Sequence, residues 1–150
     1  LGDVFVILFF GLVAVGCTYY VQSSGITPVA GLLGLACGLV INNILIVNNC
    51  RDVEEDIRAR KRTLVVFFRK KFAYYQYLLS TSAAIVVSLW LACREFGMVT
   101  LPALLPLSYS VFLAMRLSKL SCAPEYADAL KGAGLVVATY GILLSLGIAL

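Results

Sequence analysis

The chain has 150 residues, of which 61% are hydrophobic and only 13% are charged. A soluble domain is typically about 45–50% apolar and about 25% charged, so this chain lacks the polar side chains that a water-facing surface needs. The net charge of +4 does not indicate nucleic-acid binding, because eight of the twelve basic residues lie between Arg51 and Lys71. Membrane topology alone predicts such a local excess of positive charge.

The first two predicted spans lie in a long uncharged run. From Val4 to Cys50 the chain contains no Asp, Glu, Lys or Arg. This run is more than twice the roughly 20 residues that cross a bilayer core. The polar turn at 22–28 divides it, which predicts transmembrane helices at about 4–21 and 29–49.

Three more apolar runs follow a charged stretch, at about 72–93, 98–115 and 132–150. They are continuous rather than alternating, which favours helices over the strands of a closed barrel. The predicted fold class is therefore all-α, a polytopic transmembrane bundle with five helices in this chain. The lipid bilayer is its first expected partner.

Glycine and proline residues predict two local features of these helices. Gly34 and Gly38 have the four-residue spacing that allows close contact with a neighbouring helix. Pro102 and Pro106 lie inside the fourth predicted helix, where each removes a backbone donor, so we expect a kink there.

Basic residues predict the orientation of the bundle. If the loop at 48–71 is cytoplasmic and the helices alternate in direction, its eight basic residues share a side with Arg116, Lys119 and Lys131, while Arg94 alone lies opposite. Eleven against one is a clear positive-inside asymmetry. The sequence thus predicts a multi-pass protein of the cell (inner) membrane, with a cytoplasmic motif loop and an outward C-terminus.

Cysteine and histidine usage excludes several kinds of site. The chain has five cysteines, none in a C-x-x-C pair, and no histidine. The usual zinc, haem and Cys–His nucleophile patterns are therefore absent. The cysteines are interpreted as small apolar residues within the helices.

The charged segment after the second span contains a possible metal and diphosphate site. If the helix continues, Asn48, Asp52 and Asp56 are spaced i, i+4, i+8 and share one face. Mg²⁺ commonly binds through one or two carboxylates together with phosphate oxygens of a ligand. Cations beside such a face would neutralise the charge of a diphosphate leaving group. The cations that follow are Arg58, Arg60, Lys61 and Arg62.

A solvated helix with internal ion pairs is the alternative interpretation. Pairs with i, i+4 spacing are available throughout the segment, namely Arg51–Glu55, Glu54–Arg58 and Asp56–Arg60. Four asparagines favour the site, because polar groups in membrane segments are costly and usually face a bundle interior. They are Asn42, Asn43, Asn48 and Asn49.

The segment resembles a known motif. Asn48-Asn49-x-Arg51-Asp52-x-x-x-Asp56, followed by Lys61-Arg62-Thr63-Leu64, is similar to the second aspartate-rich motif of the UbiA-type intramembrane prenyltransferases. The closest branch is the 1,4-dihydroxy-2-naphthoate prenyltransferases of menaquinone synthesis, whose pattern is N-N-x-R-D-x-x-x-D-x-x-x-G-K-x-T-L. The stretch 11–22 and the final helix also resemble that branch, so the likeness covers essentially the whole chain.

The chain departs from this family in two ways. The family glycine before the lysine is Arg60 here, which could stiffen the loop or add a cation near the diphosphate. Family members have about nine helices and a first acidic motif, roughly N-D-x-x-D, which these 150 residues do not contain. The chain therefore resembles the C-terminal portion of such an enzyme, and a missing N-terminal half with that motif is an expected partner.

The resemblance implies a reaction and a role for each motif residue. The family binds a polyprenyl diphosphate through Mg²⁺ between its two acidic motifs, and an aromatic ring attacks the resulting allylic cation. In the naphthoate branch, CO₂ and diphosphate are lost and demethylmenaquinol forms. Asp52 and Asp56 would be the catalytic metal ligands. The implied diphosphate contacts are Asn48, Arg51, Lys61 and Arg62.

Two other assignments remain open. The chain could belong to another UbiA-type branch that uses a ubiquinone precursor, homogentisate or haem, or it could be a membrane transporter or structural subunit whose charged loop only sets topology. Tyr19 and Tyr20 could line a cation site, but their position opposite the motif favours interfacial anchors. Because half of the implied metal site is absent, we expect the isolated chain to be inactive.

Overall fold

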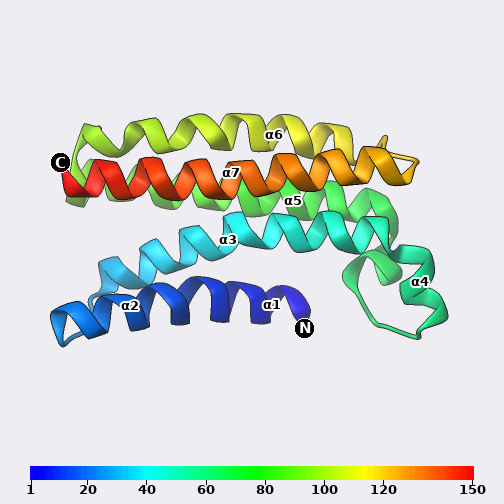
Figure 1. The fold of residues 1–150 in the computed structure, drawn as a ribbon, viewed down its shortest axis with the longest axis horizontal. Coiled ribbons are helices and arrows are strands. Elements are labelled where there is room, and N and C mark those ends of the chain that lie inside the picture. Colours follow the sequence, from blue (N-terminus) through cyan, green and yellow to red (C-terminus); the bar gives the residue numbers. More distant parts are fainter.

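The structure is a computed structural model that describes residues 1–150, and every regular element in it is a helix. Five helical stretches are long and apolar enough to cross a membrane, and Figure 1 shows them side by side along the long axis of the molecule. The predicted all-α transmembrane bundle is therefore confirmed, and the chain is a multi-pass membrane protein. The stretches are α1–η1–α2 (Gly2–Val6, Ile7–Val13, Ala14–Ser23), α3 (Pro28–Arg51), α5–η2 (Leu64–Leu91, Ala92–Phe96), η3–α6 (Met98–Leu104, Leu105–Leu117) and α7 (Ala123–Ala149).

The connections alternate between two ends of the bundle. The short helix α4 (Val53–Arg58) and the α6–α7 connection lie at one end, which we call the motif end. The turn between α2 and α3 and the C-terminus lie at the opposite, far end (Figure 1). This arrangement agrees with the alternating helix directions that the sequence predicted.

Two helices begin earlier than predicted because polar residues start them. Helix α5 begins at Leu64, after Thr63 accepts a hydrogen bond from the N–H of Val66 at 3.3 Å. Helix α7 begins at Ala123, where the Glu125 carboxylate accepts a hydrogen bond from the N–H of Cys122 at 3.2 Å. Such N-terminal caps satisfy backbone donors that a helix leaves unpaired. The apolar runs in the sequence mark the membrane parts of these helices and miss their polar first turns.

The two prolines of the fourth span lie on either side of a change in helix type. Pro102 lies within the 3₁₀ helix η3, and Pro106 lies in the first turn of α6. A proline in the first turn removes no helical hydrogen bond, because the donors of that turn have no partner within the helix. The span changes from 3₁₀ to α-helix at Leu105, between the two prolines, and the kink itself stays a prediction.

Glycines bring the first span against α3 at backbone distance. A Cβ atom added to Gly11 would lie 2.5 Å from the carbonyl oxygen of Gly34 and 2.7 Å from the Cα of Gly38. Only hydrogen fits in that space. The close contact predicted from the Gly34–Gly38 spacing is confirmed, and it fixes how α1, η1 and α2 pack on α3.

On its other side, α3 is held by buried hydrogen bonds. Asn43 Nδ2 donates to Thr81 Oγ1 of α5 at 2.9 Å, and the hydroxyls of Thr81 and Ser110 of α6 lie 3.1 Å apart. Tyr77 accepts a hydrogen bond from Ser110 at 3.3 Å and is fully buried. Its position near the inner end of the third predicted span indicates an interfacial anchor, and this prediction is wrong. This network fixes α3 relative to α5 and α6, and therefore the height of the charged residues that follow α3.

The glycine contact can be tested by adding one methyl group. Gly11→Ala should lower the thermal stability of the full-length protein in detergent, because overpacking against backbone costs about 1–3 kcal/mol. Gly16→Ala is the matched control, since a Cβ at Gly16 meets nothing within 4 Å. The control should be neutral or slightly stabilising. Equal melting temperatures for the two variants would contradict the packing described here.

Candidate functional site

Asn48, Asp52 and Asp56 remain in line although the helix bends between them. The N–H of Asp52 donates to the carbonyl of Asn48 at 2.9 Å, and the N–H of Asp56 donates to the carbonyl of Asp52 at 2.8 Å. Asp52 itself ends α3, with φ −94° and ψ 11°. The predicted common face is thus present, carried by hydrogen bonds four residues apart rather than by one continuous helix.

The end of α4 returns Lys61 to Asp56. Past the end of the helix, the N–H of Arg60 donates to the carbonyl of Ile57 at 3.1 Å, and the N–H of Lys61 donates to the carbonyl of Asp56 at 2.9 Å. This pair of bonds is a Schellman motif, whose second-last residue adopts the left-handed conformation. Arg60 does so, with φ +53°. The motif places Lys61 Nζ 2.8 Å from Asp56 Oδ1.

Asp56 and Asp52 each contact one cation. Asp56 is only 3% exposed, although it lies outside the membrane spans. Asp52 accepts two hydrogen bonds from Arg51, from Nε to Oδ1 at 2.6 Å and from Nη2 to Oδ2 at 2.9 Å. A charge-assisted pair of this bidentate form fixes the orientation of the carboxylate.

These contacts favour the charged forms of Asp52 and Lys61. Hydrogen bonding to Arg51, together with its positive charge, holds the pKa of the Asp52 carboxyl below its usual range. The hydrogen bond and charge of Asp56 raise the pKa of the Lys61 ammonium. Asp52 therefore loses its charge only as the pH falls below the ordinary aspartate range, and Lys61 only as it rises above the ordinary lysine range. Both are charged at neutral pH.

The ion pairs differ from those of a solvated helix. The three pairs in the structure are Arg51–Asp52, Lys61–Asp56 and Lys131–Asp128. None of the i, i+4 pairs expected for a solvated helix forms. Cations contact the two motif carboxylates instead, which favours the site interpretation of this segment.

The donor set fits a metal only in part. No group of three or more His, Cys, Asp or Glu side chains is close enough to hold an ion. Asp52 and Asp56 offer two hard oxygen ligands on one face, which suits an ion that takes its other ligands from phosphate oxygens. This chain can therefore supply part of a divalent-metal site and not a complete cage.

Two pockets flank the end of α3. An apolar pocket of about 210 Å³ lies between the first span and α3, and Asn48 lines it together with Val6, Phe10, Ile41, Ile44 and Leu45. Arg51 lines a separate polar pocket of about 230 Å³, together with Glu54, Glu55 and Lys70. Asn48 and Arg51, predicted to bind one diphosphate, thus line different pockets. Arg62 is exposed and joins none of the ion pairs.

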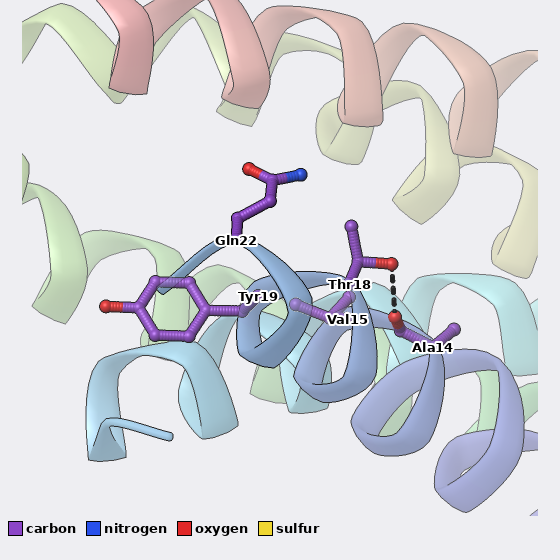
Figure 2. Close-up of a pocket in the computed structure, with 5 residues that line it drawn as sticks. All are labelled: Ala14, Val15, Thr18, Tyr19 and Gln22. Atoms are coloured by element: carbon purple, nitrogen blue, oxygen red, sulfur yellow. Dashed lines mark hydrogen bonds between the residues drawn. The ribbon is translucent and has the colours of Figure 1, made fainter. Parts of the chain in front are cut away.

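A third pocket is lined by α2 alone. It measures about 380 Å³ and its lining residues are Ala14, Val15, Thr18, Tyr19 and Gln22. Figure 2 shows Tyr19 and Gln22 pointing in different directions, and the Thr18 hydroxyl donating to the carbonyl of Ala14. The pocket contains no charged group and lies on α2, toward the far end (Figure 1). This location agrees with the view that Tyr19 is an interfacial anchor.

A sequence profile of the UbiA prenyltransferase family matches residues 1–131. The chain belongs to the UbiA prenyltransferase family. It is 42% identical over 85 residues to a 1,4-dihydroxy-2-naphthoate octaprenyltransferase of Haemophilus influenzae, a match that covers 55% of this chain and 28% of that protein. It is 29% identical over 148 residues to a 1,4-dihydroxy-2-naphthoate octaprenyltransferase of Mycobacterium leprae, covering 96% of this chain and 48% of that protein.

A third such match, to a protein of the same description from Bacillus subtilis, is 28% identical over 131 residues and covers 87% of this chain and 37% of that protein. The chain therefore spans about half, or less, of the length of the curated relatives it matches. No solved structure matches the chain at a significant level.

The Schellman motif explains the glycine of the UbiA pattern. The residue before the lysine must adopt positive φ for the lysine to return to the second aspartate, and glycine does so without a steric cost. Arg60 adopts the same conformation at a cost of about 1–2 kcal/mol. The departure from the pattern therefore leaves the loop geometry intact and adds strain.

Sequence reasoning missed one polar contact. The first predicted span began at Val4 and left out Asp3, whose Oδ1 accepts a hydrogen bond from Gln76 Nε2 at 2.6 Å. Ionisable residues within membrane spans are usually functional, so a span that included Asp3 would have made it a candidate site residue.

The strain at Arg60 can be measured by hydrogen exchange. Arg60→Gly should slow exchange of the Lys61 amide several-fold, because the left-handed cost disappears. Arg60→Val should accelerate it, since a β-branched residue strongly disfavours positive φ. Both are read in the full-length protein in nanodiscs. Indistinguishable protection in the two variants would show that the loop does not depend on this conformation.

Proposed function

We propose that the whole protein transfers a polyprenyl group from polyprenyl diphosphate to 1,4-dihydroxy-2-naphthoate, with release of CO₂ and diphosphate and formation of demethylmenaquinol. The observation that carries this proposal is the pair Asp52 and Asp56, which lie on one face with cations directly beside them. Membership of the UbiA prenyltransferase family supports the reaction type. The names of the matched relatives support the acceptor.

The motif end is the proposed site of the diphosphate. Asp52 and Asp56 would hold a Mg²⁺ ion, which when bound would supply positive charge against the diphosphate oxygens. Lys61 reaches Asp56 from an exposed position, so its ammonium can also contact a diphosphate placed over that carboxylate. Arg51 orients Asp52 through two hydrogen bonds, and Arg62 adds a nearby unpaired cation.

The apolar pocket beside Asn48 is the proposed site of the first prenyl units. Its lining is aliphatic and aromatic apart from Asn48, whose backbone carbonyl accepts a hydrogen bond from the N–H of Asp52. A prenyl diphosphate has the same order of polarity, an ionic head followed by a hydrocarbon chain. The pocket would hold the chain and exclude water near the bond that breaks.

The proposed setting is the inner membrane with the motif end toward the cytoplasm. The basic residues gathered near that end support this orientation through the positive-inside rule. Polyprenyl diphosphate and the naphthoate would then both reach the site from the cytoplasmic side.

The role of the two carboxylates is tested by replacing each aspartate with alanine in the full-length protein. Asp52→Ala and Asp56→Ala should each reduce prenyl transfer at least about a hundredfold while the protein remains in the membrane. Glu54→Ala, a neighbouring exposed carboxylate of α4, is the matched control and should retain activity. Turnover like that of the wild type in either aspartate variant would exclude the metal assignment.

Metal removal gives an independent test. A chelator should abolish prenyl transfer by the full-length protein, and added Mg²⁺ should restore it. Assays with each aromatic acceptor of the UbiA-type branches, under the same conditions, identify the substrate. Prenyl transfer that persists in the chelator would contradict the proposed role of Asp52 and Asp56, as would measurable transfer by the 150-residue chain alone.

A further inference from the structure

One carboxylate lies within the helix bundle, away from the motif. Asp3 of α1 is half-buried, accepts one hydrogen bond from Gln76 of α5 and joins no ion pair. Its neighbour Gly2 lies against Leu45, because a Cβ on Gly2 would be 3.5 Å from Leu45 Cδ2. Leu45 precedes Asp52 by seven residues, or about 10 Å along the helix. Asp3 therefore lies about two turns deeper than the proposed diphosphate site. The N-terminus lies beside α3, short of α4 (Figure 1).

Two buried amide oxygens without a hydrogen-bond partner also lie on this part of α3, Asn42 Oδ1 and Asn43 Oδ1. Asn42 is 3% exposed, and its Oδ1 has no hydrogen-bond partner. Asn42, Leu45 and Asn49 are spaced i, i+3, i+7, so they share the face of α3 on which Leu45 meets α1. A buried carbonyl without a donor costs about 1–3 kcal/mol, and polar groups at membrane depth usually mark a substrate path.

The chemistry of these groups selects a ligand that donates hydrogen bonds. Asp3 offers a carboxylate that Gln76 only partly satisfies, and Asn42 offers a free amide oxygen. A diphosphate consists of acceptors and cannot pair with either group. A hydroxyarene donates through its O–H groups, and its ring could lie between this level and the carbon that leaves the diphosphate.

Building on the proposed prenyl transfer, we infer that Asp3, oriented by Gln76, is the base that takes a proton from a hydroxyl of the aromatic acceptor. The O–H bond breaks, the proton goes to the Asp3 carboxylate and the electron pair stays on the aryl oxygen. The ring carbon, made more nucleophilic, then forms a bond to C1 of the prenyl group. The bond from C1 to the diphosphate oxygen breaks, and diphosphate leaves with that electron pair. The bond from the attacked ring carbon to its carboxylate then breaks, CO₂ leaves, and the electron pair of that bond restores the aromatic ring as the aryl oxygen takes the proton back from Asp3.

Few other ionisable groups face this position. Residues 41–49 of α3 contain no ionisable side chain, and Asp3 is the only ionisable side chain of α1 and η1. On α5, Tyr74, Tyr75 and Tyr77 lie within one turn of Gln76, and Tyr77 is already bonded to Ser110. Lys71 lies five residues from Gln76 toward the motif end. Asp3 is therefore the carboxylate available to a ligand at this depth.

The test compares Asp3→Asn with the wild type in the full-length protein, using polyprenyl diphosphate and 1,4-dihydroxy-2-naphthoate. A general base contributes about 10²–10⁴-fold, so kcat should fall by at least about a hundredfold with KM for the diphosphate unchanged. The loss should shrink as the pH is raised and the acceptor hydroxyl ionises without help. Asp128→Asn is the matched control, because that carboxylate is exposed near the start of α7.

Each outcome decides the inference. An equal kcat for Asp3→Asn and the wild type overturns it, and so does a loss of the same size at every pH, which indicates a purely structural contact. If Asp3→Asn does not fold, Gln76→Leu replaces it. This variant should lower kcat about tenfold with KM for the diphosphate unchanged, and an unchanged kcat overturns the inference. A wild-type protein that transfers prenyl groups to no hydroxyarene refutes the proposed function instead.

Discussion

The contact between Lys61 and the buried carboxylate of Asp56 is the interaction on which the motif end depends. Asp56 is almost fully buried, and a buried carboxylate that loses its cation is destabilising. The end of α4 supplies that cation locally, because the Schellman hydrogen bonds return the chain to Asp56 within five residues. The position of Asp52 relative to Asp56 is set by the hydrogen bond from the N–H of Asp56 to the carbonyl of Asp52. The carboxylate face is therefore organised by neighbouring residues rather than by distant contacts.

The rest of the bundle sets where this local structure lies in the membrane. Helix α3 is held on one side by hydrogen bonds from Asn43 to α5 and α6, and on the other by the contact of Gly11 with Gly34 and Gly38. These are the two ways in which membrane helices associate without a hydrophobic driving force. Together they fix the height and rotation of Asp52. They also place α1 close enough to α5 for Asp3 to reach Gln76.

Much of this arrangement could be predicted from the sequence, and the exceptions have physical causes. Apolar runs identify five spans because a bilayer requires about 20 such residues, and i, i+4 arithmetic puts Asp52 and Asp56 on one face. The same arithmetic paired Asp56 with Arg60, whereas the structure pairs it with Lys61. The difference arises because Arg60 has positive φ, which ends the helical spacing before Lys61. A residue with positive φ can be predicted from a sequence only when it is glycine. Tyr77 was misplaced because its hydrogen-bond partner comes from another helix, 33 residues away.

The turn that follows the motif has a consequence for the lipid around the protein. Phe67 and Phe68, in the first turns of α5, are 62% and 59% exposed. Arg69 has a non-helical φ of +67° and separates these first turns from the rest of α5. Aromatic rings at such a position prefer the headgroup layer. The two rings would anchor the segment that follows Lys61 at the bilayer surface. The segment after Lys61 would thus contact the headgroup layer directly, in addition to the Schellman hydrogen bonds that join Lys61 to α4.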